Sequence, residues 1–332
     1  MRNPPDAKTD IETFEMKPSQ KFACFAFKNI AVHNSLSASL ALGTGLWVLP
    51  HSPIQLDAQW KKWVGTIKSE KIGESNLFLL AVKDSNTPEI LDHENQELLR
   101  RVNMLFYGIL LQGVPDTVEG WTFTGARIAN EITIRSMGDL YNYYHSRPLA
   151  RIVIGAGTCK TARLFADGYR MIEDSTDYAR IKRGMRAVIR GLKEPSAEDR
   201  IHEYVRALEA LIKPTIGATT KQFVHRSQTI ALASRDAKKI LEECYLIRNA
   251  VEHMHSADDT LASYPKPHRE SIAFRRLRQL EGLTFAVYLK LATSNAHAAL
   301  FKTDSDIESF WLKKDHERCL AWGPGVDLAK IA

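Results

Sequence analysis

Three features that this sequence lacks exclude several classes of protein. It has only four cysteines in 332 residues, and Cys24, Cys159, Cys244 and Cys319 form no CxxC pair and no short metal-ligand spacing. This argues against a disulfide scaffold or a structural zinc site and suits a reducing compartment. The opening MRNPPDAKTD lacks the apolar core of a secretory signal. The strongly apolar patch MLFYGILLQG is far shorter than the roughly 20 residues of a membrane span. We therefore expect a soluble, cytoplasmic protein without membrane contact.

The composition is that of a globular protein, with 44% hydrophobic and 25% charged residues. A length of 332 residues is enough for two domains, because single hydrophobic cores stop growing at about 250 to 300 residues. The formal net charge is +6 and the isoelectric point is about 9.0. This excess of basic residues favours an acidic partner, of which RNA and DNA are the commonest.

The first half of the chain predicts an α+β domain over residues 20–150, after a disordered leader over residues 1–19 that is polar and contains proline. Short segments rich in aromatic and β-branched residues predict strands in KFACFAF, GLWVLP, LFLLAV, WTFTGARI and ITIR. Between them, LDAQWKKWVGTIKSEK and NQELLRRVNMLFYGILLQ predict helices. This half contains no catalytic constellation that we recognise.

Near residue 150 the pattern changes to long amphipathic helices, which predicts an all-α helical bundle over residues 151–300 and a C-terminal tail over residues 301–332. YARIKRGMRAVIRGLK predicts one helix. PSAEDRIHEYVRALEALIKP predicts the next, with Ser196 as N-cap and Pro214 as the stop. Two more helices are expected at about residues 235–254 and in SIAFRRLRQLEGLTFAVYLKLAT.

A basic stripe follows one face of the first of these helices and consists of Arg183, Arg186, Arg190 and Lys193. Such a stripe can bind RNA phosphates, and Arg275, Arg276 and Arg278 could extend it. A solvated helix face is the commoner explanation of a charge run.

The stretch LIRNAVEHMH, residues 246–255, carries polar side chains on a predicted helix. Apolar residues recur there at the spacing of one buried face, in Ile240, Cys244, Ile247, Val251 and Met254. A step of about 100° per residue places Asn249 and His253 nearly opposite this stripe and Arg248 on its flank. Leu241 and Tyr245 form a second apolar patch. Because a helix with two apolar faces usually meets a second partner, we expect Leu241 and Tyr245 to contact a second copy of the chain.

A simpler explanation of this stretch stays open. Arg248 and Glu252 are four residues apart and can form a surface ion pair worth only a few tenths of a kcal/mol. His253 and His255 can decorate a helix C-terminus, where cations are favoured.

The surrounding sequence resembles a known family. RNAVEH resembles the signature of HEPN domains, an arginine and a polar residue followed by a histidine, and IHEYVRALEALIKP with FVHRSQTIA resembles the Apea-like branch of that family. The resemblance covers roughly residues 158–295. It implies a HEPN-like helical bundle that cleaves RNA without a metal ion or other cofactor. In that reaction the ribose 2′-hydroxyl attacks the neighbouring phosphate and leaves 2′,3′-cyclic phosphate and 5′-hydroxyl ends.

The resemblance implies catalytic roles for Arg248, Asn249 and His253. An imidazole, with an ordinary pKa of about 6.5, suits proton transfer near neutrality, so His253 is the expected proton carrier. The fork of donors on Arg248 matches a scissile phosphate. Asn249 can hydrogen-bond the phosphate, the ribose or the histidine ring. Because one chain supplies one arginine and one histidine, facing motifs in a homodimer would supply two of each. Glu203, Arg206 and Glu209 are expected to brace the bundle or to orient Arg248.

We therefore expect an endoribonuclease, with a prokaryotic toxin or antiphage defence effector as the role suggested by family analogy. Its N-terminal domain would sense or recruit, its substrate would be an RNA such as tRNA, and a regulatory partner or phage-derived trigger could control it. The alternative is a non-catalytic HEPN-like module that binds RNA, a nucleotide or a partner and mainly dimerises. A purely structural interaction protein is a third possibility.

Two further motifs carry little weight. RIVIGAGTCKTA resembles a phosphate loop, but Ile154 and Cys159 stand where that loop needs glycine, and only Lys160 and Thr161 fit. We expect a strand or loop that leads into the first helix of the bundle. His316 and Cys319 have a ligand-like spacing, but two ligands are too few for a metal site.

Overall fold

A computed structural model describes residues 14–331 of the chain, except residues 44, 55, 57, 114–118, 141–142 and 144–152. The chain divides into two compact units. The sheet unit comprises Met1–Ile109, Pro115–Leu140 and Ile152–Arg163, and the helical unit comprises Leu110–Val114, Tyr141–Arg151 and Leu164–Ala332. An antiparallel sheet region is therefore followed by a region of many helices, as expected. The predicted boundary near residue 150 lies outside the described residues.

The sheet unit is built on six antiparallel strands in the order β2-β3-β4-β1-β5-β6. The strands are β1 (Gln20–Lys28), β2 (Leu40–Gly43), β3 (Leu46–Leu49), β4 (Leu77–Asp84), β5 (Glu119–Ile128) and β6 (Glu131–Asp139). Strand β1 is central, and its sequence KFACFAF is buried at every residue because both faces of the sheet are covered.

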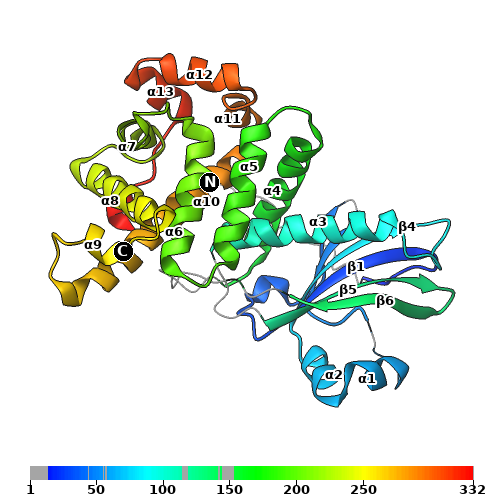
Figure 1. Cartoon of the computed structure of the whole chain (residues 1–332). Coiled ribbons are helices and arrows are strands. Elements are labelled where there is room, and N and C mark those ends of the chain that lie inside the picture. The colour runs from blue at the N-terminus through cyan, green and yellow to red at the C-terminus, as the bar shows by residue number, and fades with distance from the viewer. Residues whose placement is uncertain are drawn as a thin grey trace, which may run out of the picture. The chain divides into compact units, whose positions relative to one another are not determined.

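Three helices cover the two faces of the sheet (Figure 1): α1 (Ala58–Val64), α2 (Thr66–Gly73) and α3 (His93–Leu110). On one face, the ring of Phe106 from α3 lies 5.9 Å from that of Phe25 and 5.1 Å from that of Phe27. On the other face, α2 contributes Ile72 to a core that includes Phe22. Successive side chains of a strand point to opposite faces, so β1 supplies both cores.

Part of the predicted leader belongs to the sheet unit. Residues 1–13 lie outside the described residues. Met16 is buried in the sheet core, and the ring of Phe14 lies 5.0 Å from that of Trp47. The prediction of a disordered leader through residue 19 is therefore wrong from Phe14 onward, because these apolar side chains pack against the sheet.

The helical unit contains most of the remaining helices (Figure 1). They are α4 (Ala156–Asp174), which spans both units, α5 (Ala179–Lys193), α6 (Ala197–Ile212), α7 (Thr219–Ile230), α8 (Arg235–Glu252), α9 (Ala257–Thr260), α10 (Lys266–Thr293), α11 (Asn295–Ala299), α12 (Asp304–Leu312) and α13 (Asp315–Trp322). The predicted N-cap of α6 is confirmed, because Ser196 accepts a hydrogen bond from the backbone N–H of Asp199.

Close packing among α5, α6 and α10 depends on a glycine. A Cβ atom at Gly184 of α5 would lie 1.6 Å from the hydroxyl oxygen of Tyr288 of α10. That hydroxyl donates a 2.7 Å hydrogen bond to the backbone oxygen of Ala207 on α6. Only a glycine leaves room for this bond, so the position of α6 against α5 and α10 is fixed at Gly184.

The predicted C-terminal tail is part of the helical unit. Residues 301–332 include α12 and α13, and most of their large apolar side chains are buried, among them Phe301, Ile307, Phe310, Trp311 and Trp322. The Trp311 indole N–H donates a 2.9 Å hydrogen bond to the backbone oxygen of Leu211 in α6. The prediction of a tail is wrong, because α12 packs against α6 and α13 packs against α7.

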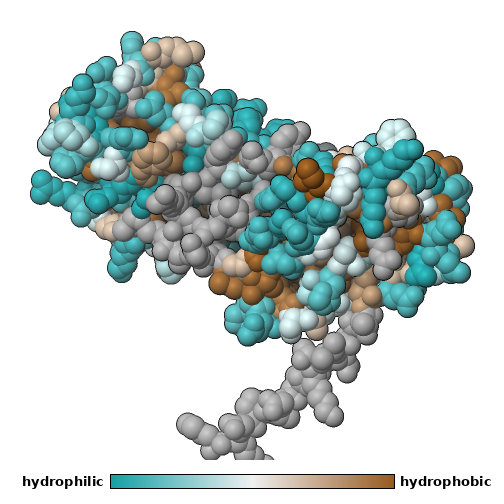
Figure 2. Space-filling model, turned by 90° about the horizontal axis from the view of Figure 1, so that it is seen from below, coloured by the Kyte–Doolittle hydropathy of each residue, from teal (hydrophilic) through white to brown (hydrophobic). Residues whose placement is uncertain are grey.

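The described surface is mixed in character, as Figure 2 shows, with hydrophobic side chains among hydrophilic ones on the face seen from below. In the part of the chain that the structure covers, no helix has the length and apolar composition needed to cross a membrane.

Candidate functional site

The residues expected to act together lie on α8, which packs beside α6 in the helical unit (Figure 1). Ser234 caps the start of α8 by accepting a hydrogen bond from the N–H of Ala237, and His253 is the C-cap. Ile240, Cys244 and Ile247 are buried as the apolar spacing predicts. Met254 was predicted on the same stripe but is exposed, because α8 ends at Glu252 and helical periodicity no longer applies.

Arg248 is held by carboxylates from two helices. Its Nη2 lies 3.4 Å from Glu209 Oε2 on α6 and 3.6 Å from Glu252 Oε2 on α8, and 19% of its side chain is exposed. Its Nη1 donates a 3.2 Å hydrogen bond to the side-chain oxygen of Asn249. The buried Nε atom has no hydrogen-bond partner in the described structure. The guanidinium is therefore oriented through its Nη1 and Nη2 groups, while its Nε–H donor forms no hydrogen bond.

Glu209 is also fixed from its other side. Its Oε1 accepts a 3.0 Å hydrogen bond from the hydroxyl of Tyr245, and the guanidinium carbon of Arg248 lies 5.7 Å from the Tyr245 ring centre. Burial raises the pKa of the Tyr245 hydroxyl, which therefore stays a donor at neutral pH. The expectation that Glu209 orients Arg248 is consistent with these contacts.

Leu241 and Tyr245 do not form the surface that we expected for a second copy of the chain. Leu241 is 0% exposed and Tyr245 is 2% exposed. The Tyr245 ring lies 4.9 Å from the ring of Phe223 on α7. The second apolar patch of α8 is covered within the chain because α7 packs against it.

His253 is presented to solvent at the end of α8. Its side chain is exposed, and its ring centre lies 6.3 Å from that of His255. Within the described residues the ring takes part in no hydrogen bond or ion pair. Asn249 is paired with Arg248 and not with the histidine ring. The structure thus brings Arg248 and Asn249 together and leaves His253 accessible beyond them.

A second histidine lies at this site, and the sequence analysis missed it. His202 of α6 is hydrogen-bonded through Nε2 to Glu252 Oε2 at 2.6 Å, and 16% of its side chain is exposed. This hydrogen bond and then the charge of Arg248 lower the pKa of the Glu252 carboxyl against the opposing effect of burial. His202 shares a polar face of α6 with Arg206 and Glu209, at spacings of four and three residues. That spacing places His202 on the face of α6 that carries Glu209, but it does not show that Glu252 is its partner.

The predicted basic stripe on α5 is only partly available. Arg183 and Arg186 are exposed, whereas Arg190 pairs with Glu203 of α6 at 2.9 Å. Lys193 is partly buried, and desolvation lowers its pKa. The proposed extension fails at Arg276, which is buried and bonded to Glu243 at 2.5 Å.

The two weaker motifs take ordinary structural places. Lys160 and Thr161 lie inside α4, which begins at Ala156, and Ile154 forms an isolated bridge with Val32. His316 and Cys319 lie on α13. Within the described ranges, no group of three or more His, Cys, Asp or Glu side chains is arranged to hold a metal ion.

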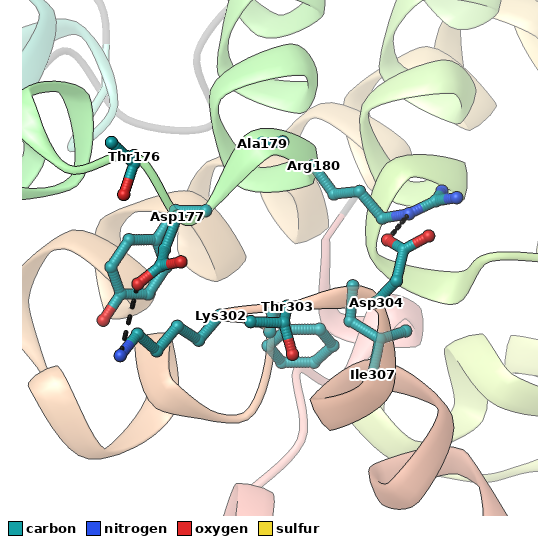
Figure 3. A pocket seen from close by; sticks show the side chains of 10 residues that line it. Thr176, Asp177, Ala179, Arg180, Lys302, Thr303, Asp304 and Ile307 are labelled. Atoms are coloured by element: carbon teal, nitrogen blue, oxygen red, sulfur yellow. Dashed lines mark hydrogen bonds and ion pairs between the residues drawn. The ribbon is translucent and has the colours of Figure 1, made fainter.

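A pocket of about 250 Å³ lies between the start of α5 and the start of α12 (Figure 3). Its charged side chains pair with each other: Lys302 Nζ lies 3.2 Å from Asp177 Oδ2, and Arg180 Nε lies 2.7 Å from Asp304 Oδ1. These charges therefore compensate one another within the pocket.

Comparison with known proteins gives no further information on this site. No protein-family model, curated protein or solved structure matches the chain.

Proposed function

We propose that this chain is an endoribonuclease of the HEPN type that cleaves RNA without a metal ion. The observation that carries the proposal is the arrangement of Arg248. Its guanidinium is fixed by Glu209 and bonded to Asn249, on a helix whose end presents the ring of His253 to solvent. These three residue types match what the reaction needs: a phosphate holder, a polar positioning group and a proton carrier.

The reaction forms a bond between the ribose 2′-oxygen and phosphorus and breaks the bond from phosphorus to the 5′-oxygen. His253 would accept the proton of the 2′-hydroxyl, because its exposed ring has no hydrogen-bond or ion-pair partner among the described residues. Arg248 would stabilise the negative charge of the pentavalent phosphorus with its fork of donors. The leaving 5′-oxygen also requires a proton, and a second histidine from a facing copy would supply it.

We further propose that the active form is a homodimer that meets on the exposed face of α8. This face runs through Glu242, Leu246, Asn249 and His253, at helical spacings of four, three and four. Leu246 is exposed there, and Met254 is exposed just beyond the end of the helix. These apolar side chains replace Leu241 and Tyr245 as the proposed contact, since those two are buried.

A non-catalytic binding module is the second candidate, and one observation favours it. Glu209 and Glu252 both lie within ion-pair distance of Arg248, so the guanidinium is largely compensated in the free chain. Such a site could bind RNA or a partner weakly without reacting. The basic residues Arg183 and Arg186 would contribute to RNA binding under either candidate.

Cleavage of RNA in excess EDTA tests the proposal. We expect the wild-type protein to cut total cellular RNA, including tRNA, and to leave ends that are sensitive to cyclic phosphodiesterase. The His253→Ala variant should lose activity by about 100-fold or more, because proton transfer by a positioned side chain contributes that much. The matched control is His255→Ala, which removes an exposed histidine two residues away and should retain activity.

The outcomes separate the two candidates. Equal cleavage by wild type and His253→Ala would overturn the catalytic assignment. RNA binding without cleavage, unaffected by His253→Ala but weakened by Arg248→Ala, would favour the binding module. If the nuclease is correct, its role would suit a toxin or antiphage effector whose sheet unit responds to a trigger.

A further inference from the structure

One carboxylate oxygen lies between an imidazole and a guanidinium at the α6 and α8 site. Glu252 Oε2 is 2.6 Å from Nε2 of His202 and 3.6 Å from Nη2 of Arg248. The shorter contact is a charge-assisted hydrogen bond, and the longer one is an ion pair without a close hydrogen bond. The same oxygen therefore compensates the permanent charge of Arg248, and also that of His202 when the imidazole is protonated.

The other charged groups around His202 are already paired with one another. Its Nδ1 lies 4.0 Å from Glu203 Oε1 on its own helix, and Glu203 is itself paired with Arg190 of α5 at 2.9 Å and with Arg206 at 3.7 Å. Toward α10, α6 presents Arg200, which is paired with Glu281 at 2.7 Å. Glu203 already has two arginine partners, so the charge of His202 changes its balance little. Glu252 is therefore the carboxylate whose interaction with Arg248 depends on the charge of His202.

The charge of His202 would then decide how much of the Arg248 charge is available. With a neutral imidazole, the carboxylate of Glu252 compensates Arg248, and an incoming phosphate must compete with it. With an imidazolium, Glu252 is matched by His202, and Glu209, 3.4 Å away, is the carboxylate that still compensates Arg248. Arg248 can then give more of its charge to a phosphate. The lowered pKa of Glu252 keeps this carboxylate ionised in both cases.

We propose that His202 is a positioning residue that sets, through Glu252, how strongly Arg248 holds a phosphodiester. The proposal rests on the proposed function in one respect, that the ligand of Arg248 is an RNA phosphate. His202 does not touch the substrate in this scheme. The affinity of the site for RNA would then be higher with a protonated imidazole at this position than with a neutral one.

The test uses a fluorescent 2′-O-methyl RNA oligonucleotide, which has no 2′-hydroxyl and so cannot be cleaved by the proposed reaction. Its affinity for the full-length protein is measured by anisotropy from about pH 8 to about pH 5.5, a range that spans the titration of an ordinary imidazole. We expect the wild type to gain about three- to tenfold more affinity over this range than His202→Gln, whose amide keeps a hydrogen bond to Glu252 but cannot titrate. Glu252→Gln should bind RNA more tightly than wild type at pH 8 and lose the same part of the pH dependence.

The matched control is His225→Gln. His225 of α7 lies 3.4 Å from Asp315 and forms another pair of a histidine and a carboxylate, in which the arginine partner of the carboxylate is Arg318. This variant should keep the wild-type pH dependence. If His202→Gln also keeps it, the proposal is wrong.

A second measurement separates this proposal from the proposed function. The Nε–H signal of Arg248 is followed by NMR against pH in the free protein and assigned with Arg248→Lys. In the wild type it should move between about pH 8 and about pH 5.5, and in His202→Gln this movement should be absent. If the oligonucleotide does not bind but the NMR coupling is present, RNA as the ligand is wrong and the control by His202 stands. If the Arg248 signal has the same pH dependence in the wild type and in His202→Gln, the proposed role of His202 is wrong even if RNA binds.

Discussion

Replacing Gly184 by alanine should loosen the contact that positions α6. The new Cβ would lie 1.6 Å from the Tyr288 hydroxyl oxygen and 3.0 Å from the backbone oxygen of Ala207. Overpacking of this kind costs about 1 to 3 kcal/mol, and breaking the buried bond from Tyr288 to Ala207 adds about 1 to 3 kcal/mol. The higher helix propensity of alanine returns up to about 1 kcal/mol. We expect a net loss of about 1 to 5 kcal/mol in the free energy of unfolding.

Urea denaturation of Gly184→Ala and Gly157→Ala tests this magnitude. Gly157 lies in α4, where an added Cβ would meet no atom within 4 Å, so its replacement should be neutral or slightly stabilising. Adding Tyr288→Phe to Gly184→Ala should relieve part of the loss, because the hydroxyl at 1.6 Å disappears while the ring carbon at 2.7 Å remains. If the two glycine variants unfold within about 0.5 kcal/mol of each other, the steric argument is refuted.

Three further predictions concern single contacts. Glu243→Gln should cost about 3 to 5 kcal/mol in chemical denaturation, because it removes the charge that compensates the buried Arg276, 2.5 Å away. Ser196→Ala should lower stability by about 1 kcal/mol through loss of the α6 N-cap, and Ser196→Asp should restore it. The ion pair with Arg180, followed by a lysine contact, lowers the pKa of Asp304 to about 2. An unfolded aspartate has a pKa of about 3.9, so the stability contributed by Asp304 is present above about pH 4 and is lost as the pH falls toward 2. Asp304→Asn should lower the melting temperature at pH 7 and match wild type near pH 2; its side chain is 59% exposed, so the effect stays below about 1 kcal/mol.

The elements that the sequence predicted well are those with a strong periodic pattern. The buried strand β1 and the amphipathic helices α5 and α6 lie within two residues of the expected segments at each end. The edge strand β2, LALG, was not predicted, because it is short and half-exposed and has no pattern to distinguish it from a loop. One predicted helix is two in the structure, since Gly65 has a φ of 86° and interrupts the chain between α1 and α2.

The site could be predicted on α8 but not between α8 and α6. Arg248, Asn249 and His253 follow from the residue types and spacing of one helix. The contact of His202 with Glu252 joins residues 50 positions apart, and it depends on how the two helices are aligned along their lengths. Spacing within a helix carries no information on that alignment. The sequence could therefore suggest that α6 braces Arg248 but could not select His202.

The error at Leu241 and Tyr245 shows how a helix inside a bundle should be interpreted. Two apolar faces suggested a contact outside the chain, but in a bundle a helix commonly has neighbours on two sides, and here α7 and α10 both pack against α8. Burial on two sides leaves one face for solvent. On α8 that face carries Leu246, Asn249 and His253. The two apolar faces thus did not identify a partner. They indicate which side of α8 faces solvent, and Asn249 and His253 of the motif lie on that side, whereas Arg248 lies on its flank against α6.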